Sequence, residues 1–181
     1  FRRVLFRSMN AVREAKLALD ELQAAAKKAE AGSDPAAIEA ARQAVVAGRR
    51  KVIGLLRLAV QLGDADDRDR LNDARSALAY YLFENQQYHE AAAIGDFLLR
   101  WYSESPRSPQ AAKVTLASWQ LLQRQSTAEW GEAAKRRARD TANVILKKWP
   151  EKAEAADAAV VAIAAATEDR DPEALLALVA R

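Results

Sequence analysis

The sequence predicts an all-α protein with about eight helices. Its 181 residues include only six Gly and five Pro, the two residues that most disfavour helix interiors. Apolar residues recur every three or four positions through most of the chain, which is the spacing of one helix face. No apolar run approaches the roughly 20 residues that a membrane-spanning helix needs, and no segment convincingly predicts a strand.

Two apolar stripes predict an antiparallel helical hairpin over residues 9–63. The first stripe consists of Val12, Ala15, Leu19, Leu22, Ala26 and Ala29. The second consists of Ile38, Ala41, Val45, Gly48, Val52, Leu55, Ala59 and Leu62. Gly32 is expected to end the first helix, and Asp34-Pro35 is a typical start for the second. Gly48 on the seam lets the two backbones approach closely.

Six further helices are expected within residues 64–181. The third has an inner face formed by Leu71, Ala74, Leu78, Tyr81 and Leu82. Breaks between helices are expected near Gly32, Gly63, Asn85, Ser105, Gln125, Pro150 and Asp169. Ser108 is expected to cap the fifth helix, and Ser126 with Glu129 to form a capping box for the sixth. The Ala-rich residues 152–167 predict a seventh helix, and Asp171-Pro172 opens the eighth.

The first eight residues differ in character from the rest. Their sequence, FRRVLFRS, matches the translation of a sequencing-adaptor oligonucleotide, so we expect residues 1–8 to be a non-native tail on a metagenomic fragment. The rival interpretation is a short basic amphipathic anchor. The formal net charge of +3 equals the three arginines of this segment, so the remaining chain is formally neutral. The basic isoelectric point is therefore no argument for nucleic-acid binding.

A pattern of a large aliphatic residue followed by a small one recurs along the chain. It appears at Leu78-Ala79, Leu116-Ala117 and Ile163-Ala164, 38 and 47 residues apart. Such periods, with two helices per unit, indicate a helical repeat. The residues Tyr88-x-x-Ala91, Phe97-Leu98-Leu99 and Tyr102 resemble the second helix of a tetratricopeptide repeat (TPR). The following Ser105-Pro106-x-Ser108-Pro109 resembles the variant found in bacterial cell-envelope TPR proteins.

The resemblance covers roughly residues 67–181 and implies a right-handed α-solenoid over residues 64–181. Its units would be about 67–106, 109–150 and 153–181, the last truncated. In TPR arrays the first helix of each unit lines a concave groove. Carried onto this chain, the groove residues would be Asp73, Ser76, Tyr80, Phe83, Val114 and Ser118. The alternative is that Tyr80 and Phe83 pack on the preceding hairpin. Gly95 departs from the family pattern, because an aromatic residue often occupies that position.

Few residues in this sequence suggest catalytic or metal chemistry. There is no Cys and a single His, His89, which we interpret as a solvated residue in the first turn of a helix. The acids Asp64, Asp66, Asp67 and Asp69 lack EF-hand spacing and suit a helix start. No cofactor motif appears. The basic runs 49–51 and 135–139 are interpreted as solvated helix faces, although the second, near Trp130, is also a candidate phosphate or RNA site.

The sequence and the resemblance together predict a non-catalytic scaffold that binds a partner protein or peptide. Nucleic acid is not favoured as a partner. Two alternatives stay open: a helical accessory domain of an enzyme lost by truncation, and a basic RNA- or phosphate-binding helical module. The resemblance to bacterial cell-envelope proteins implies a place in the cell envelope or periplasm, but the residues themselves do not determine the location and leave the cytoplasm open.

Overall fold

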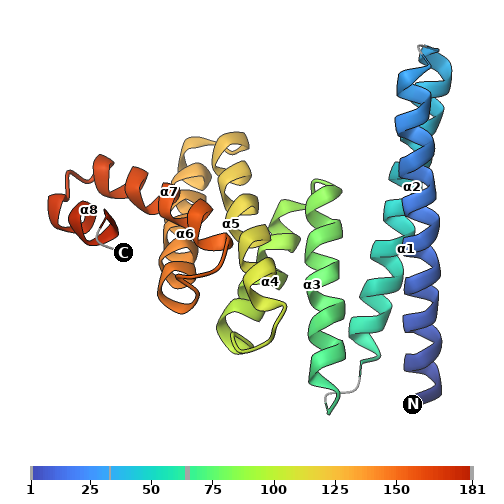
Figure 1. Cartoon of the computed structure of the whole chain (residues 1–181), viewed down its shortest axis with the longest axis horizontal. Helices are drawn as coiled ribbons and strands as arrows, with labels where there is room; N and C mark the ends of the chain where they lie inside the picture. The colour runs from blue at the N-terminus through green and yellow to red at the C-terminus, as the bar shows by residue number, and fades with distance from the viewer. Residues whose placement is uncertain (1, 33, 64–65, 180–181) are drawn as a thin grey trace. The chain divides into compact units, whose positions relative to one another are not determined.

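The computed structural model describes residues 2–32, 34–63 and 66–179, with the side chains of residues 2–9, 174 and 179 excepted. Within this part of the chain there are eight helices and no strand, so the predicted all-α fold is confirmed (Figure 1). The helices are α1 (Arg2–Ala31), α2 (Pro35–Gln61), α3 (Arg68–Glu84), α4 (Tyr88–Trp101), α5 (Ser108–Gln125), α6 (Ala128–Lys148), α7 (Glu154–Glu168) and α8 (Pro172–Val179). None of them, as described, combines the length and hydrophobicity needed to cross a bilayer.

Every expected break lies between two helices or within one residue of such a gap. The Asp34 side chain caps α2 by accepting a hydrogen bond from the Ala36 amide at 3.0 Å. Two other predicted caps are wrong. Ser108 lies inside α5, where its hydroxyl donates to the Tyr102 carbonyl at 2.5 Å. Ser126 terminates α5, and Thr127 occupies the N-cap position of α6 without a side-chain bond.

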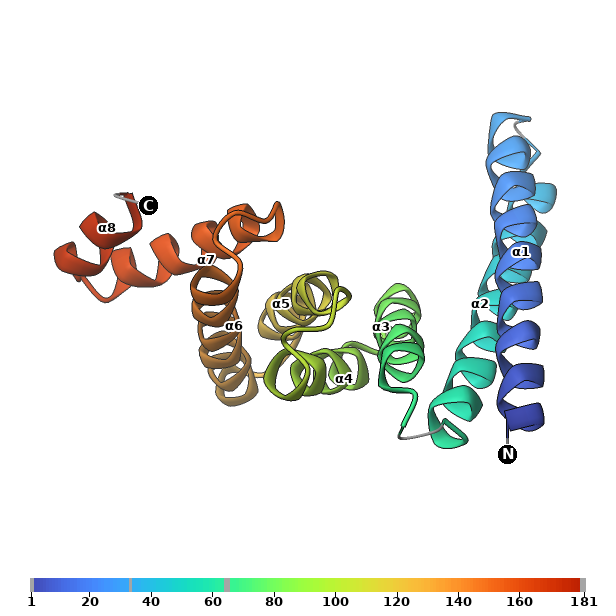
Figure 2. The same ribbon diagram turned by 60° about the horizontal axis from the view of Figure 1, so that its bottom comes forward.

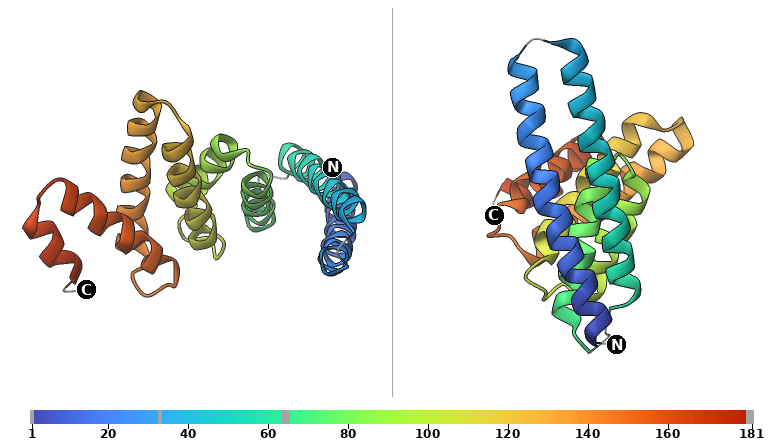
Figure 3. Two further views of the ribbon diagram at one scale, coloured as in Figure 1. Left: turned by 90° about the horizontal axis from the view of Figure 1, so that it is seen from above. Right: turned by 90° about the vertical axis from the view of Figure 1, so that its right-hand side faces the viewer.

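The first compact unit, Phe1–Asn85, contains a hairpin and a third helix. Helices α1 and α2 run antiparallel along each other (Figure 3, right), and α3 packs on α2. A Cβ atom on Gly48 would lie 2.8 Å from Leu22 Cδ1, so glycine permits the close approach of α1 and α2 expected from the sequence. The helix α1 is continuous from Arg2, across the expected boundary between residues 8 and 9.

The second compact unit, Gln86–Arg181, contains α4 to α8. Within this unit α5, α6, α7 and α8 each pack on the preceding helix, and α7 also contacts α5. Figure 2 shows the order of these helices. The core is formed by Leu99, Ala112, Leu116, Ala138, Ala142, Ile145, Leu146, Ala155, Ala158 and Ala162. Six of these ten side chains are alanine, so the core combines small side chains with four large aliphatic ones, Leu99, Leu116, Ile145 and Leu146.

The division between the units differs from the expected boundary at residues 63 and 64. It follows Asn85, so α3 is grouped with the hairpin and the expected repeat 67–106 spans the division. The physical reason lies in the contacts of α3. Leu71 packs against Gly63, Lys16 of α1 lies 5.7 Å from the Tyr81 ring, and Arg49 of α2 bonds to Glu84.

The glycines of α4 and α2 allow a matched test of close packing. A Cβ on Gly95 would lie 1.9 Å from Thr115 Oγ1 and 2.9 Å from the Ala111 carbonyl, whereas nothing lies within 4 Å of one on Gly54. We expect Gly95→Ala to destabilise the protein by roughly 1–3 kcal/mol, as overpacking usually does. Gly54→Ala should stabilise it by about 1 kcal/mol through helix propensity alone. Urea unfolding followed by circular dichroism measures both. Equal effects would contradict the α4–α5 contact.

The repeated leucines allow a test of the core. Leu78 and Leu116 are both buried, one in each unit. Replacing either by Ala should cost roughly 2–5 kcal/mol, as for other core leucines. Thermal and urea unfolding of the two variants measure this cost, with the exposed Leu176→Ala as the control that should change little. A cost below about 1 kcal/mol at both buried sites would contradict their assignment to the core.

Candidate functional site

The six residues expected to line a groove are divided between the two units. Asp73, Ser76, Tyr80 and Phe83 belong to α3, and Val114 and Ser118 belong to α5. Asp73 is exposed and Tyr80 is 42% exposed. Ser76 is buried and Phe83 half-buried. Of the four expected groove residues on α3, Asp73 and Tyr80 are therefore the most accessible to a partner.

Val114 and Ser118 lie on the buried side of α5. The Ser118 hydroxyl donates to the Val114 carbonyl at 2.7 Å, so this buried hydroxyl has its hydrogen-bond acceptor within the helix. Ser118 has no exposed surface and Val114 very little. These two positions present almost nothing to a ligand in this conformation.

Tyr80 and Tyr81 form an aromatic pair on α3. Their ring centroids are 5.2 Å apart and the rings meet edge-to-face at 77°, a favourable arrangement of ring quadrupoles. Partial burial raises the pKa of Tyr80, and the carboxylate of Glu84 raises it further. Both rings are therefore neutral phenols near neutral pH, and Tyr80 offers an apolar ring with a polar edge.

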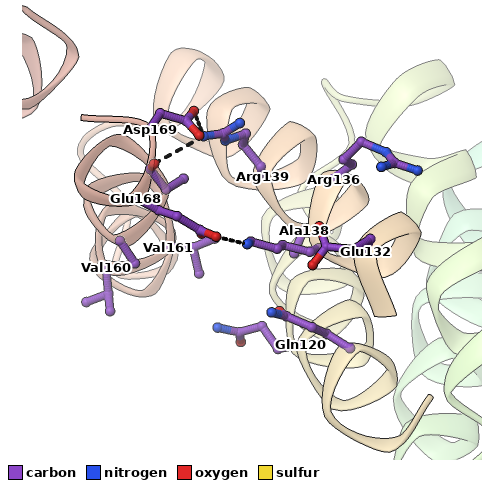
Figure 4. Close-up of a pocket in the computed structure, with 13 residues that line it drawn as sticks. Gln120, Glu132, Arg136, Ala138, Arg139, Val160, Val161, Glu168 and Asp169 are labelled. Atoms are coloured by element: carbon purple, nitrogen blue, oxygen red, sulfur yellow. Dashed lines mark hydrogen bonds and ion pairs between the residues drawn. The ribbon is translucent and has the colours of Figure 1, made fainter. Parts of the chain in front are cut away.

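A second candidate surface is a groove between α5, α6 and α7, which we call the α6–α7 groove (Figure 4). Its volume is about 420 Å³. The apolar part is formed by Ala138 of α6 with Val160, Val161, Ala164 and Ala165 of α7. Val160 is 66% exposed although its side chain is apolar. The polar part is formed by Gln120, Gln123, Glu132, Lys135, Arg136, Arg139, Glu168 and Asp169.

Two ion pairs cross one end of the α6–α7 groove. Lys135 of α6 bonds to Glu168 of α7, and Arg139 bonds to Asp169 (Figure 4). Arg139 also donates to the Ala165 carbonyl at 3.2 Å. The hydrogen bond with Glu168 raises the pKa of Lys135. The groove is lined by three basic and three acidic side chains, so its lining has no net charge.

The basic run 135–139 is thus split between two environments. Arg136 and Arg137 are exposed, as expected for a solvated face, but Lys135 and Arg139 are turned toward α7. Sequence reasoning missed these pairs because the partner acids lie about 30 residues further along the chain. The available signal was the i,i+4 spacing of Lys135 and Arg139 combined with acids at the end of the next antiparallel helix.

Other chemically reactive groups do not converge. His89 is exposed in the first turn of α4. Asp67 is the N-cap of α3, accepting from the Arg70 amide at 3.4 Å, and Asp69 lies in the first turn, whereas Asp64 lies outside the described residues. Across the described residues, no three His, Cys, Asp or Glu side chains are grouped as a metal site requires. Comparisons with protein-family models, curated proteins and solved structures give no match.

The ion pairs should hold the end of α7 against α6. Lys135→Glu places two carboxylates opposite each other, so the backbone amides of the last turns of α7 should exchange hydrogen faster. The reciprocal variant Lys135→Glu/Glu168→Lys should restore the exchange rates. Arg136→Glu, an exposed neighbour, is the matched control and should leave α7 unchanged. Hydrogen exchange read by mass spectrometry would show no change in any variant if the pair does not anchor α7.

Proposed function

We propose that the protein is a non-catalytic, TPR-like scaffold whose α6–α7 groove binds an apolar segment of a partner peptide or helix. In this proposal α5 and α7 are the first helices of two successive repeat units. The continuous packing of α4 to α7, with the additional α5–α7 contact, supports a repeat arrangement. Both first helices contribute residues to the groove, as the TPR resemblance implies.

The observation that carries the proposal is the apolar outer face of α7. Residues 158–166 contain no charged or polar side chain, although a helix on the surface of a protein ordinarily has a polar outer face. Ala158, Ala162 and Ala166 pack inward, whereas Val160, Ile163 and Ala164 remain exposed. Exposed apolar side chains beside a groove are typical of a surface that a partner covers.

The charges of the groove favour a protein over a phosphate-rich partner. Nucleic-acid sites concentrate cations, because phosphate neutralisation supplies most of the affinity. Here Lys135 and Arg139 are already paired with acids, and the lining is neutral as a whole. An accessory domain of an enzyme would use the same apolar face, with the catalytic domain as its covalently attached partner.

The test is capture of partners by the immobilised full chain, compared across variants. Val160→Glu places a charge on the apolar rim and should weaken capture of a specific partner more than about tenfold, since an unpaired buried charge costs at least about 1.4 kcal/mol. Leu17→Glu makes the same kind of change at an exposed position on α1 and should leave capture unchanged. Arg137→Gln, at an exposed position outside the groove lining, should also have little effect.

The aromatic residues Tyr80 and Phe83, which were expected to line a groove, provide a second test in the same capture experiment. Tyr80→Ala/Phe83→Ala should abolish capture with an intact fold if the α3 residues belong to the binding surface. Loss of cooperative unfolding in this variant would instead assign the two rings to the core of the first unit. An RNA- or phosphate-binding module predicts the opposite result: the arginine variant loses partner binding, whereas Val160→Glu binds normally.

A further inference from the structure

The hairpin presents a long groove between two side-chain stripes, which we call the hairpin groove. On α1 the stripe contains Lys16, Asp20, Gln23, Lys27 and Glu30, and on α2 it contains Leu56, Ile53, Arg49, Val46 and Arg42. Each stripe steps by three or four residues, so its members share one helix face. Because α1 and α2 are antiparallel, the two stripes can border the same channel along the hairpin.

Helix α3 occupies only one end of the hairpin groove. Its last turns are held by Lys16 beneath the Tyr81 ring and by Arg49, whose Nη1 donates to the Glu84 carbonyl at 2.6 Å. The exposure of the α2 stripe rises where α3 ends, from 3% at Ile53 to 37% at Val46. Figure 1 shows the hairpin continuing well beyond the end of α3.

Beyond α3 the hairpin groove is open. This open part has a volume of about 550 Å³ and is lined by Gln23, Ala26, Lys27, Glu30, Arg42, Val45, Val46 and Arg49. In the first unit, residues 20–51 include no fully buried side chain among those described, although Leu22, Ala26, Val45 and Gly48 follow the apolar stripes. At the α3 end, α3 accompanies the burial of α2 side chains such as Ile53. The open part likewise combines apolar and charged side chains, but no helix of this unit covers it among the described residues.

The charge of the open part indicates the chemistry of its occupant. Lys27, Arg42 and Arg49 are basic, and Glu30 is the only acid in the lining. Arg42 bonds to Glu30 at 3.1 Å, and Arg49 Nη2 lies 3.5 Å from the Glu84 carboxylate. Arg49 Nε is buried and has no acceptor among the described residues. The lining has two more basic than acidic side chains, whereas the lining of the α6–α7 groove has equal numbers of both. Such an excess favours an occupant that carries carboxylates.

We propose that the open part of the hairpin groove binds an acidic amphipathic helix of a partner protein, seated as a continuation of α3. The apolar stripe of that helix contacts Ala26, Val45 and Val46, and its carboxylates face Lys27, Arg42 and Arg49. The lining spans residues 42–49 of α2, which corresponds to about two helical turns. Arg49, which bonds to the Glu84 carbonyl at the end of α3, marks the closed end of this site. The site is independent of the α6–α7 groove.

The test uses a fluorescein-labelled, side-chain-stapled helical peptide of about 12 residues with leucines at i, i+3, i+4 and i+7 and glutamates on the flanks. A twin peptide carries lysines in place of the glutamates. Fluorescence anisotropy with the full chain should show saturable binding of the acidic peptide and weak binding of its twin. Lys27→Glu/Arg42→Glu should weaken the acidic peptide more than about tenfold and strengthen the twin, because like charges then oppose each other.

The control is Lys28→Glu/Arg50→Glu, which makes the same charge change at exposed neighbours outside the lining and should alter affinity less than about fivefold. Val46→Ser should weaken the acidic peptide without a charge change, and Val160→Glu should have no effect, which separates this site from the proposed function. Absence of saturable binding, or equal sensitivity in the control, overturns the proposal. So does a concentration-dependent dimer that Val46→Ser disrupts, because a second copy of the chain is then the occupant.

Discussion

The close approach of helix backbones is the constraint on which both units depend. Gly95 of α4 leaves room for Thr115 of α5 where a Cβ would be only 1.9 Å from its hydroxyl, and Gly48 does the same for α1 and α2. Thr115 turns its hydroxyl back to the Ala111 carbonyl at 2.9 Å, so a polar group is accommodated in a dry contact. Small side chains at these contacts let each helix pair gain dispersion contacts along its backbone. The larger apolar area of the two units comes from buried leucines such as Leu19, Leu56 and Leu98.

Where small side chains form the helix contacts, polar residues at the edges of the helices help to define the relative position of neighbouring helices. In the second unit, the ion pairs of Lys135 and Arg139 join α6 to the end of α7, whose position along α6 an alanine surface alone defines poorly. In the first unit, Arg49 has the same role for α3, because it links the α3 C-terminus to the middle of α2. The candidate binding surfaces lie directly beside these polar anchors, where apolar side chains remain uncovered.

The helices could be predicted from the sequence because their signals are local. Three- and four-residue spacing, Asp34-Pro35 and the breaks at Gly63 and Pro150 act within a turn or two of the chain. Which helices pack together in one unit was less predictable. The resemblance implied a groove face on α3, yet its partners Lys16 and Arg49 lie on helices that the repeat pattern does not include. Val114 and Ser118 were expected in the groove because of the resemblance, but both are buried. Burial on α5 depends on how it packs with α4, α6 and α7, which the pattern of a single helix does not reveal.

The division after Asn85 also separates the chromophores of the protein. All four tryptophans, Trp101, Trp119, Trp130 and Trp149, belong to the second unit, whereas the first unit contains tyrosines but no tryptophan. Emission excited at 295 nm, a wavelength that selects indole, therefore originates in Gln86–Arg181 alone, while far-ultraviolet ellipticity sums the helices of both units. The protein therefore has an intrinsic fluorescence probe in one unit only, and fluorescence and ellipticity curves that do not coincide during denaturation would show that the two units unfold in separate transitions.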